Sequence, residues 1–396
     1  MNVDVCVRAC NLQGSPVRTG RTPVAVDTLP LRVVGGLGAG GYAVVVKAEL
    51  ETGVVYAMKV LAKHKDATRR DKDRLKVELR VMTEVPPSPF LQRCHMAFES
   101  TSDLFFVVDF VAGGDLFSHL IARIKRHGTG FSEPEARVLL AEICVGLEHM
   151  HKHGFVHRDI KVPSSPECRS TRGRACRSCR NARFHSAQVE NIMLDGRGHV
   201  KLIDFGLAVE LSKRDNEPMS PTGSLIYMSP EMLRDSTGGR HTDWWAVGVL
   251  AHELMTGRTP WSSLTDKKII RKEIRTMNVA PPRRLSPQAG KLICSLLRQE
   301  HRARLGTKSD GEVFAASFFA AVDWAATAAQ TAAPAFDPGQ DGASDKDQQA
   351  ALAQYLSRAP PPPDALWMLG LDIVRQHPEY CDHRDDDNDG ADGNFF

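Results

Sequence analysis

A glycine-rich loop near the start of the chain has the composition of a turn that could cover phosphates. It contains Gly36, Gly38, Gly40 and Gly41. Glycine permits close backbone approach and unusual φ values, so the N–H groups of such a loop can lie over phosphates. A dinucleotide-binding turn needs a helix directly after its glycines, whereas the valines at 44–46 continue a strand pattern. The loop therefore predicts either a phosphate-binding hairpin or an ordinary glycine hairpin.

Side chains suited to phosphate and metal chemistry follow this loop. Each of them alone could be a surface residue, but their order and spacing along the chain are informative together. In chain order the groups are Ala57-Met58-Lys59, Glu78, His157-Arg158-Asp159, Asn191 and Asp204-Phe205-Gly206.

At these residues the chain resembles a eukaryotic protein kinase, and the resemblance covers about residues 31 to 324. Within that family it is most similar to the AGC group, the relatives of cAMP-dependent protein kinase. The resemblance implies a protein serine/threonine kinase that uses ATP and Mg²⁺. The text that supports the AGC assignment is ETGVVYAMKVL, FVVDFVAGGDLFSHL, HTDWWAVGVLAHELMTGRTPW and ASFFAAVDW.

The resemblance assigns the chemical step to four residues. Asp159 orients the substrate hydroxyl and accepts its proton, and Lys161 offsets charge on the moving phosphoryl group. Asp204 and Asn191 are the expected Mg²⁺ ligands.

The resemblance also assigns residues to ATP. Lys59 contacts the α- and β-phosphates and is held by Glu78, and Tyr42 covers the phosphates. Ala43 stands where the family has its third loop glycine; a second register of the loop uses Gly36, Gly38 and Gly41 instead. The remaining positions expected at ATP are Gly38, Gly40, Val45, Ala57, Val108 as gatekeeper, and Asp109 to Val111 as the adenine hinge.

Substrate recognition and regulation follow from the same resemblance. The acids Asp115, Glu190 and Glu253 fall where basophilic relatives bind arginine, which predicts a preference for Arg two and three residues before the acceptor. Ser224 matches the residue that commonly bonds the catalytic Asp and Lys. Arg158 suggests a basic pocket for a phosphorylated activation loop, with an upstream kinase acting on Ser220 or, as an alternative, Thr222. Glu231 is expected to pair with Arg304.

The secondary-structure pattern around these residues predicts an α+β fold. Residues 31 to 60 indicate strands joined by a glycine loop and a turn, and residues 63 to 85 indicate an amphipathic helix. Ser132 and Glu135 form a capping box before a helix with apolar residues at core spacing, and further helices are expected at 243–256 and 286–299. The expected fold is the bilobal kinase fold: a five-stranded antiparallel sheet with one main helix, a helical C-lobe, and ATP between them.

This reading divides the chain into five parts. Residues 1–30 are an N-terminal extension, 31–111 the N-lobe, and 112–324 the C-lobe, interrupted by an insert at 162–188. Residues 325–396 are an Ala/Pro/Asp-rich tail, in which Pro334 to Pro338 resembles the start of an AGC tail. Both the extension and the insert are expected to be disordered.

The insert splits the expected catalytic loop. Its 27 residues are rich in Arg and Ser, and their removal gives HRDIKVENIMLD, a sound kinase loop. Valine codons begin with GT and glutamine codons can end in AG, so a retained in-frame intron is one hypothesis for its origin, which transcript sequencing tests. The alternative hypothesis is a regulatory insert. It could bind zinc through Cys168, Cys176, Cys179 and His185, bind RNA through its arginines, or form a solvated loop.

The insert also bears on activity. We expect the chain to be much less active than one that lacks 162–188, and an impaired pseudokinase or ATP-binding scaffold is the alternative function.

The composition excludes several classes of protein. The 396 residues carry 51 Lys+Arg and 48 Asp+Glu, a net charge of +3 that does not argue for a nucleic-acid or membrane partner. Apolar stretches are far shorter than the roughly 18 to 20 residues of a membrane span. Nine cysteines in a chain without a secretory signal pattern indicate reduced thiols and a cytoplasmic location, with the nucleus as a further possibility. Protein substrates with basic motifs are the expected partners.

Overall fold

A computed structural model describes residues 31–39, 43–50, 52–63, 69–99, 103–161, 191–211, 217–218 and 223–339. The described residues form two compact units, one from 31–86 and 92–110 and the other from 87–91 and 111–339. Gly40, Tyr42, Glu190, Ser220 and Thr222 lie outside the described residues. So do the N-terminal extension, the insert with its four candidate zinc ligands, and the tail beyond 339.

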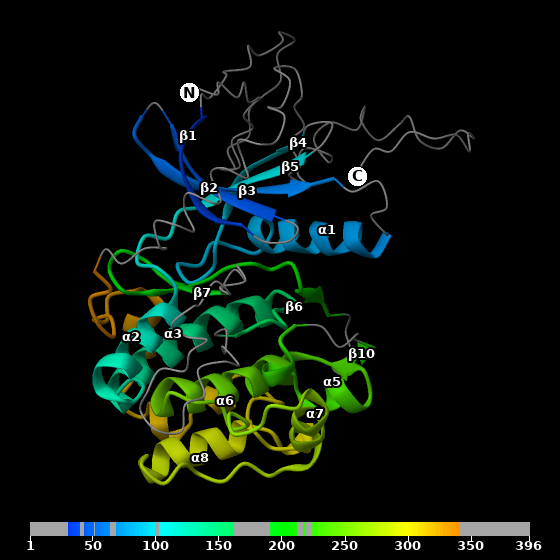
Figure 1. Ribbon diagram of the computed structural model, residues 1–396, viewed down its shortest axis with the longest axis vertical. Coiled ribbons are helices and arrows are strands. Elements are labelled where there is room, and N and C mark those ends of the chain that lie inside the picture. Colours follow the sequence, from blue (N-terminus) through cyan, green and yellow to red (C-terminus); the bar gives the residue numbers. More distant parts are fainter. Residues whose placement is uncertain are drawn as a thin grey trace, which may run out of the picture. The chain divides into compact units, whose positions relative to one another are not determined.

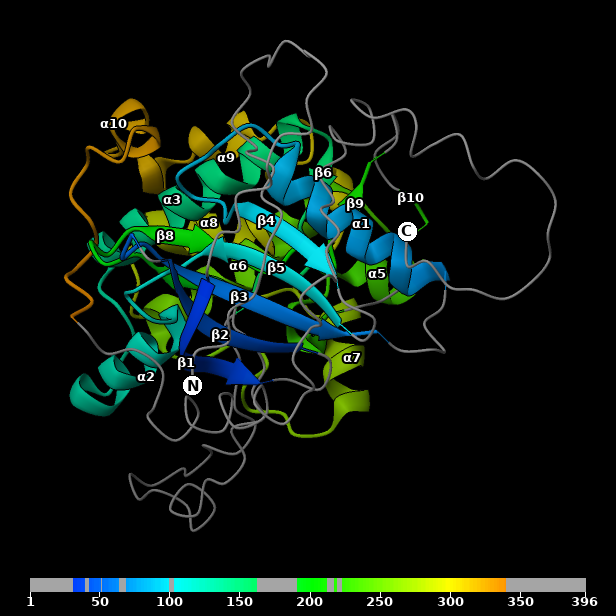
Figure 2. The same cartoon turned by 90° about the horizontal axis from the view of Figure 1, so that it is seen from above.

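The first unit is built on a five-stranded antiparallel sheet (Figures 1 and 2). Its strand order is β1-β2-β3-β5-β4, and every neighbouring pair is antiparallel. The predicted N-lobe sheet and the α+β fold class are thereby confirmed. The strands are β1 (Leu31–Ala39), β2 (Ala43–Leu50), β3 (Val55–Ala62), β4 (Cys94–Glu99) and β5 (Asp103–Asp109).

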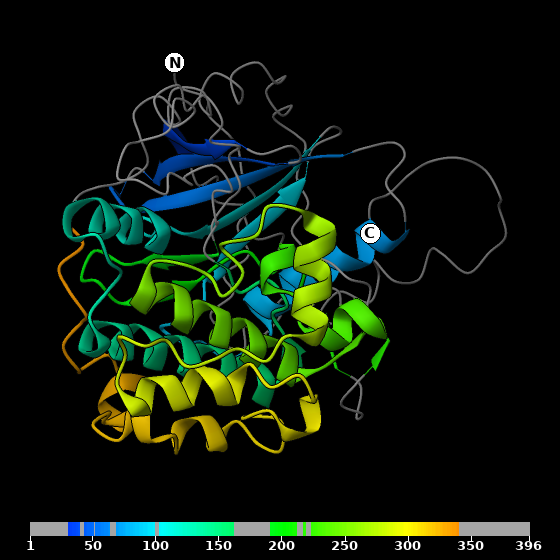
Figure 3. The same ribbon diagram turned by 60° about the horizontal axis from the view of Figure 1, so that its bottom comes forward.

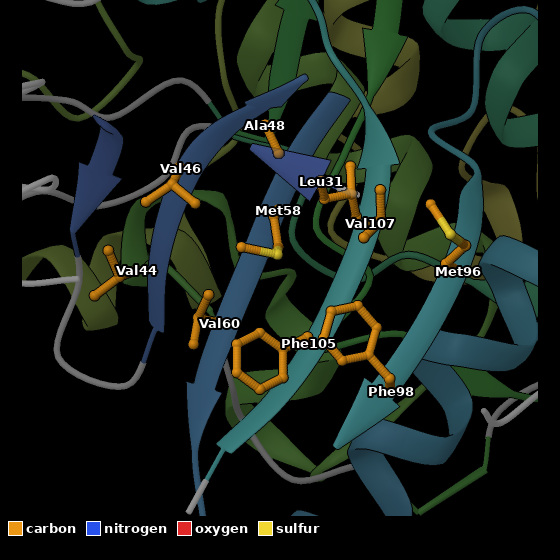
Figure 4. Packing of buried hydrophobic residues seen from close by; sticks show 10 residues of the cluster. All are labelled: Leu31, Val44, Val46, Ala48, Met58, Val60, Met96, Phe98, Phe105 and Val107. Carbon is orange, nitrogen blue, oxygen red and sulfur yellow. The ribbon is translucent and has the colours of Figure 1, made fainter. Parts of the chain in front are cut away.

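One face of this sheet carries an apolar core (Figure 4). Side chains alternate between the two faces of a strand, and Val44, Val46 and Ala48 on β2 are all buried. The rings of Phe98 and Phe105 stack from adjacent strands with centroids 4.7 Å apart. Burial of such side chains supplies the main favourable term that holds the strands together.

Helix α1 (Arg69–Thr83) completes the first unit and is shorter than the 63–85 range that the sequence indicates. Its buried side chains include Glu78, Leu79 and Met82, at the spacing of one helical face. Glu78 is therefore a carboxylate on the apolar side of an otherwise highly charged helix. Such a buried charge requires a partner.

Residues 87–91 group with the second unit, although they lie inside the range predicted for the N-lobe. Leu91 forms a parallel bridge with Leu202, and the carbonyl of Phe90 accepts the N–H of Leu202 at 2.7 Å. The Phe90 side chain is fully buried and lies beside Gly146, where an added Cβ would come within 3.2 Å of it. These contacts are distant in sequence, which is why local patterns place the boundary elsewhere.

The second unit is mainly helical (Figures 1 and 3). Its helices are α2 (Leu116–His127), α3 (Glu133–Lys152), α5 (Pro230–Arg234), α6 (Arg240–Thr256), α7 (Lys267–Thr276), α8 (Pro287–Leu296), α9 (Gly311–Phe314) and α10 (Trp324–Ala328), with 3₁₀ turns η1 (Leu225–Tyr227), η2 (His301–Ala303) and η3 (Ser317–Phe319). Its short strands are β6 (Phe155–Val156), β7 (Ile192–Leu194), β8 (Val200–Leu202), β9 (Val209–Glu210), β10 (Glu217–Pro218) and β11 (Thr237–Gly238).

Two helices of this unit hold the functional segments. The predicted capping box begins α3, where Glu135 accepts the Ser132 N–H at 2.9 Å and its hydroxyl at 2.6 Å. Helix α6 is buried on nearly every side, with Trp244 and Trp245 inaccessible to solvent. A helix buried on nearly every side belongs in a core. None of the helices in the described ranges has both the length and the apolar character needed to cross a membrane.

The segment after residue 324 packs on the second unit as far as residue 339. Helix α10 spans the predicted boundary at 324/325, and Phe336 of the PAFDP segment stacks on Phe131 with centroids 5.3 Å apart. The Arg123 guanidinium lies 5.9 Å from the Phe336 ring. The described start of the predicted tail is thus part of the helical unit.

Candidate active site

A buried ion pair in the first unit joins β3 to α1. The ammonium group of Lys59 lies 2.6 Å from the carboxylate of Glu78, whose side chain is 3 % exposed. The partner that buried Glu78 requires is therefore the lysine that the sequence assigns to the phosphates. The pair fixes the direction of the lysine side chain, since a buried carboxylate is stabilised by an opposite charge at this distance.

The residues predicted at the adenine end of ATP lie on neighbouring strands of the same sheet. Ala57 and Val108 are paired across β3 and β5, and both are buried. The Asp109 carboxylate accepts the backbone N–H of Arg93 at 3.0 Å and bonds His95 Nε2 at 2.7 Å, so the end of β5 is fixed. Gly38, Ala43 and Val45 lie on β1 and β2, while Val111 is a buried residue of the second unit.

Three predicted catalytic residues meet in the second unit. Lys161 Nζ donates to Asp159 Oδ2 at 2.6 Å, and Asn191 Nδ2 donates to the same oxygen and to the Asp159 carbonyl, both at 2.7 Å. Lys161 and Asn191 lie on opposite sides of the insert in the sequence. The Asp159 carboxylate is thus bonded by a residue before the insert, Lys161, and by a residue after it, Asn191. The insert does not keep these two groups apart.

The orientation of Asn191 leaves an oxygen that suits a metal ion. Its Oδ1 is buried and has no hydrogen-bond partner among the described residues. A buried polar atom of this kind costs free energy unless an ion or water satisfies it. Asp204 adds a carboxylate in a left-handed conformation, with φ of 60°, just after β8. Amide and carboxylate oxygens form the donor set that Mg²⁺ prefers, so these residues fit the metal that the resemblance implies.

The catalytic loop is anchored by Asp243, at the start of α6. Its carboxylate accepts the backbone N–H groups of His157 and Arg158 at 2.9 and 2.8 Å. Arg158 has a φ of 67°, an unfavourable value for a residue with a side chain, and these two bonds hold it there. The buried carboxylate of Asp243 therefore fixes the backbone of the two residues that precede Asp159.

A buried histidine completes this anchor. His151 bonds Asp243 at 2.9 Å through Nε2 and Asp310 at 3.0 Å through Nδ1. Burial alone would lower the pKa of His151, but the two carboxylates outweigh it and raise that pKa to about 9. Burial also opposes ionisation of Asp243, and the histidine reverses the effect, so that the Asp243 pKa lies below its usual value. At neutral pH His151 is therefore a buried cation that bonds both Asp243 and Asp310.

The predicted substrate residues have different surroundings. Glu253 is buried, and the Tyr227 hydroxyl donates to its Oε2. Burial raises the pKa of Glu253 to about 7, although the Tyr227 hydrogen bond acts in the opposite direction. Asp115 caps α2 by accepting the Ser118 N–H at 2.6 Å.

Ser224 is placed near the catalytic loop without bonding it. The residue before it, Gly223, has a φ of 96°, and a Cβ there would lie 2.9 Å from Asp159 Oδ1. No hydrogen bond joins the Ser224 side chain to Asp159 or Lys161 among the described contacts. The backbone at Gly223 therefore makes the close approach to Asp159.

Comparison with known proteins agrees with this geometry. The family model described as "Protein kinase domain" matches residues 31–163 and 187–318. The chain belongs to the protein kinase family.

Curated proteins that are similar to this chain are named as protein kinases. It is 33% identical to human ribosomal protein S6 kinase alpha-4 over 347 residues, which cover 85% of this chain and 40% of the relative. It is 31% identical to a probable serine/threonine-protein kinase of Dictyostelium discoideum, covering 78% and 60% of the two chains. It is 31% identical to rabbit protein kinase C zeta type, covering 76% and 47%. The predicted similarity to AGC kinases is confirmed, and the kinase spans 40% to 60% of these relatives.

The family match is interrupted at the insert. Residues 164–186 of the kinase have no counterpart in the family model, and they lie inside the predicted range of 162–188. The match resumes before Asn191. The sequence on either side of the insert is therefore family sequence.

The kinase also contains a buried ion pair that the sequence predicted, between Glu231 and Arg304. The guanidinium donates to both carboxylate oxygens, at 2.6 and 2.8 Å, and both side chains are at most 1 % exposed. Burial raises the pKa of Glu231, but the charge of Arg304 outweighs this and keeps that pKa below its usual value. The pair joins α5, after η1, to the segment that follows η2.

Loss of Arg304 is expected to destabilise the kinase strongly. The Arg304→Met substitution leaves Glu231 charged and buried, and should lower the free energy of unfolding by about 3–5 kcal/mol. The matched control is Arg302→Met, two residues away and exposed, for which a change within about 0.5 kcal/mol is expected. Urea unfolding of both variants measures the difference. Equal stabilities would show that the pair does not hold α5 in place.

Proposed function

We propose that this kinase transfers the γ-phosphate of ATP to serine or threonine side chains of proteins. The observation that carries the proposal is the contact of Lys161 and Asn191 with the Asp159 carboxylate. Phosphoryl transfer requires the reacting groups to be positioned and their charge stabilised, with little covalent work by the protein. A carboxylate fixed by two donors is suited to orient a hydroxyl and accept its proton.

The groups of the first unit act on ATP in this proposal. Lys59, fixed by Glu78, neutralises the α- and β-phosphates, and the backbone of the loop from Gly38 to Ala43 lies over the phosphates. Ala57, Val108 and the hinge at 109–111 receive the adenine. The buried Lys59–Glu78 pair supports the assignment, since it holds a lysine in a single direction.

The metal ligands in this proposal are Asn191 and Asp204. Mg²⁺, when bound, neutralises phosphate charge, and the two residues contribute one amide oxygen and one carboxylate. The unpartnered Oδ1 of Asn191 supports the assignment. Asn191 thus serves two groups at once, because its Nδ2 holds Asp159 while its Oδ1 remains available.

Recognition of basic sequences is the second part of the proposal. Asp115, Glu190 and Glu253 bind arginine side chains two and three residues before the acceptor, since carboxylates accept the paired donors of arginine. A degenerate peptide array reports the preference directly. We expect enrichment of Arg at both positions, and an array without it would remove this part while leaving the transfer activity in place.

The pKa of Glu253 predicts a pH dependence of this recognition. Its folded-state pKa of about 7 means that the side chain is neutral in acid and ionised above neutrality. A carboxylate binds arginine more strongly than a carboxylic acid, so preference for Arg at −2 should rise as pH increases through 7. We expect the ratio of kcat/KM for peptides with Arg and Ala at −2 to grow about tenfold between pH 6 and pH 8. The Ala peptide controls for titration of other groups.

The Glu253→Gln variant tests the assignment of that titration. The amide does not ionise, so its ratio should stay low and flat across the same range. A ratio that rises equally in both proteins would show that another group is responsible.

Regulation by an upstream kinase completes the proposal. Phosphorylation of Ser220, or of Thr222 in its place, would add a dianion that pairs with Arg158. Phosphate mapping after treatment with an activating kinase, followed by the activity of the Ser220→Ala variant, tests it. Full activation of that variant would assign the role to Thr222 or to neither residue.

The insert favours one alternative function, that of an ATP-binding scaffold without transfer activity. The interruption of the family match within the catalytic loop is the observation behind it. An assay with γ-labelled ATP separates the kinase from the scaffold. The kinase transfers the labelled phosphate to a serine peptide, and the scaffold binds ATP without transferring it.

A further inference from the structure

Helix α7 presents a strongly basic surface that the proposed chemistry does not use. Its ten residues contain five basic side chains and one acidic one, Glu273. Four of the basic side chains are exposed, and none of the five forms an ion pair within the described part of the chain. The five are Lys267, Lys268, Arg271, Lys272 and Arg275.

The apolar face of α7 is occupied by the kinase itself. Ile270 and Ile274 are buried, one helical turn apart, and the helix packs against α5 and η1. Ile269, by contrast, is 47% exposed and lies among the exposed lysines. The outer face of α7 is thus a cationic surface with one large apolar side chain, a combination that complements an acidic protein segment.

The position of α7 links this surface to the catalytic residues. The turn η1, against which it packs, contains Tyr227, which donates to Glu253. The residue Gly223, just before η1, makes the close approach to Asp159. A partner on α7 therefore lies near the segment that joins the catalytic loop to a predicted arginine-binding residue.

We propose that α7 is a docking site for an acidic segment of the protein substrate, with an apolar side chain of that segment against Ile269. The inference rests on the proposed kinase function. A membrane surface is a poorer fit because interfacial helices bury a broad apolar face, whereas that of α7 is internal. Single-stranded nucleic acid is a poorer fit because α7 has no aromatic side chain on which bases stack.

Docking of this kind lowers the KM for the protein substrate and leaves kcat unchanged. A second contact converts acceptor binding into an intramolecular event, so the effective concentration of the acceptor rises while the chemical step is unchanged. The substrate class is then a protein with arginines before its acceptor and an acidic, partly apolar segment a short linker away.

Tethered peptides test the proposal on the full chain. One peptide carries Arg-Arg-Ala-Ser followed by a Gly/Ser linker and the acidic segment Glu-Asp-Leu-Glu-Asp-Glu; its partner has Gln and Asn in place of the acids. Linkers of 5, 10 and 20 residues cover r.m.s. spans of roughly 12 to 25 Å. We expect KM to be about fivefold to tenfold lower for the acidic peptide at its best linker, with equal kcat.

Charge reversal on two helices provides the matched variants. Arg271→Glu with Lys272→Glu should remove the KM advantage, while Lys125→Glu with Arg126→Glu, the same change at exposed residues of α2, should leave it intact. Ile269→Ser should remove part of it. Activity on the untethered peptide checks that each variant is folded.

The outcomes separate the docking site from the kinase function. Equal KM values for acidic and neutral peptides, or an advantage that survives reversal on α7, would overturn the docking site while leaving the transfer activity established. If no peptide is phosphorylated, fluorescence polarisation of the labelled acidic segment still decides, because specific loss of binding in the α7 variant supports the site. Tighter α7-dependent binding of oligo-U RNA or of phosphatidylserine vesicles than of the acidic segment would overturn it.

Discussion

The Asp159→Asn variant is expected to lose about 10²- to 10⁴-fold in kcat on a serine peptide, with little change in ATP affinity. The carboxylate of Asp159 accepts hydrogen bonds from Lys161 and Asn191 through one oxygen, and an amide at this position is neutral and does not accept the proton of a substrate hydroxyl. The groups proposed to bind the nucleotide, Lys59 and Glu78, are untouched. Steady-state kinetics with a fluorescent ATP analogue for binding separates the two effects.

Asp235→Asn is the matched control for this loss. Asp235 is an exposed residue at the end of α5, so the same chemical change there should leave kcat within about twofold. Thermal unfolding of both variants checks that the Asp159 substitution has not unfolded the protein. An Asp159→Asn enzyme with unchanged kcat would contradict the assignment of the base.

Removal of residues 162–188 is expected to raise kcat/KM for a basic peptide by about 10- to 100-fold, with little change in the KM for ATP. The contacts among Asp159, Lys161 and Asn191 are present with the insert in the chain, so it does not separate the catalytic groups. The insert does border Glu190, a predicted arginine-binding residue. Small displacements of a bound substrate lower rates by such factors.

A second variant distinguishes length from sequence in this effect. Replacement of 162–188 by a Gly/Ser segment of equal length keeps the bulk and removes the arginines and cysteines. We expect it to be as slow as the full chain if bulk obstructs the peptide, and fast if the native insert is inhibitory through its own residues. Equal kcat/KM for the full chain and the deletion would contradict the expected effect of the insert.

Much of the candidate site could be predicted because its residues lie in short motifs. Lys59, Asp159 and Asp204 are each flanked by residues that identify them, and Glu78 lies on the apolar side of a recognisable helix. The sheet was predictable from β-branched runs separated by glycine. These are local signals, read from a few neighbouring residues.

The supports of the site were not predictable in the same way. Asp243 belongs to the HTDWWAVGVLAHELMTGRTPW text that supports the AGC assignment, but its contacts are with His151, 92 residues away, and with backbone groups of residues 157 and 158. Asp310, the other carboxyl group that bonds His151, is 159 residues from that histidine in the sequence. Buried charge networks of this kind depend on which helices meet, and no local pattern records that.

Boundaries were unpredictable for a related reason. The sequence places residues 87–91 inside the first lobe, which it extends to residue 111, whereas they group with the second unit, where Leu91 pairs with Leu202. Phe336 lies in sequence of low complexity, and only its contact with Phe131 shows that this part belongs to the helical unit. Non-local packing decides both cases.

In the proposed function, the residues on either side of the insert act together in phosphoryl transfer. The most direct measurement is the transfer of label from γ-labelled ATP, with Mg²⁺, to an Arg-Arg-Ala-Ser peptide by the purified full chain. We expect slow transfer to serine, which the Asp159→Asn substitution lowers by about 10²- to 10⁴-fold and which deletion of 162–188 accelerates. ATP binding without transfer by either the full chain or the deletion would contradict it.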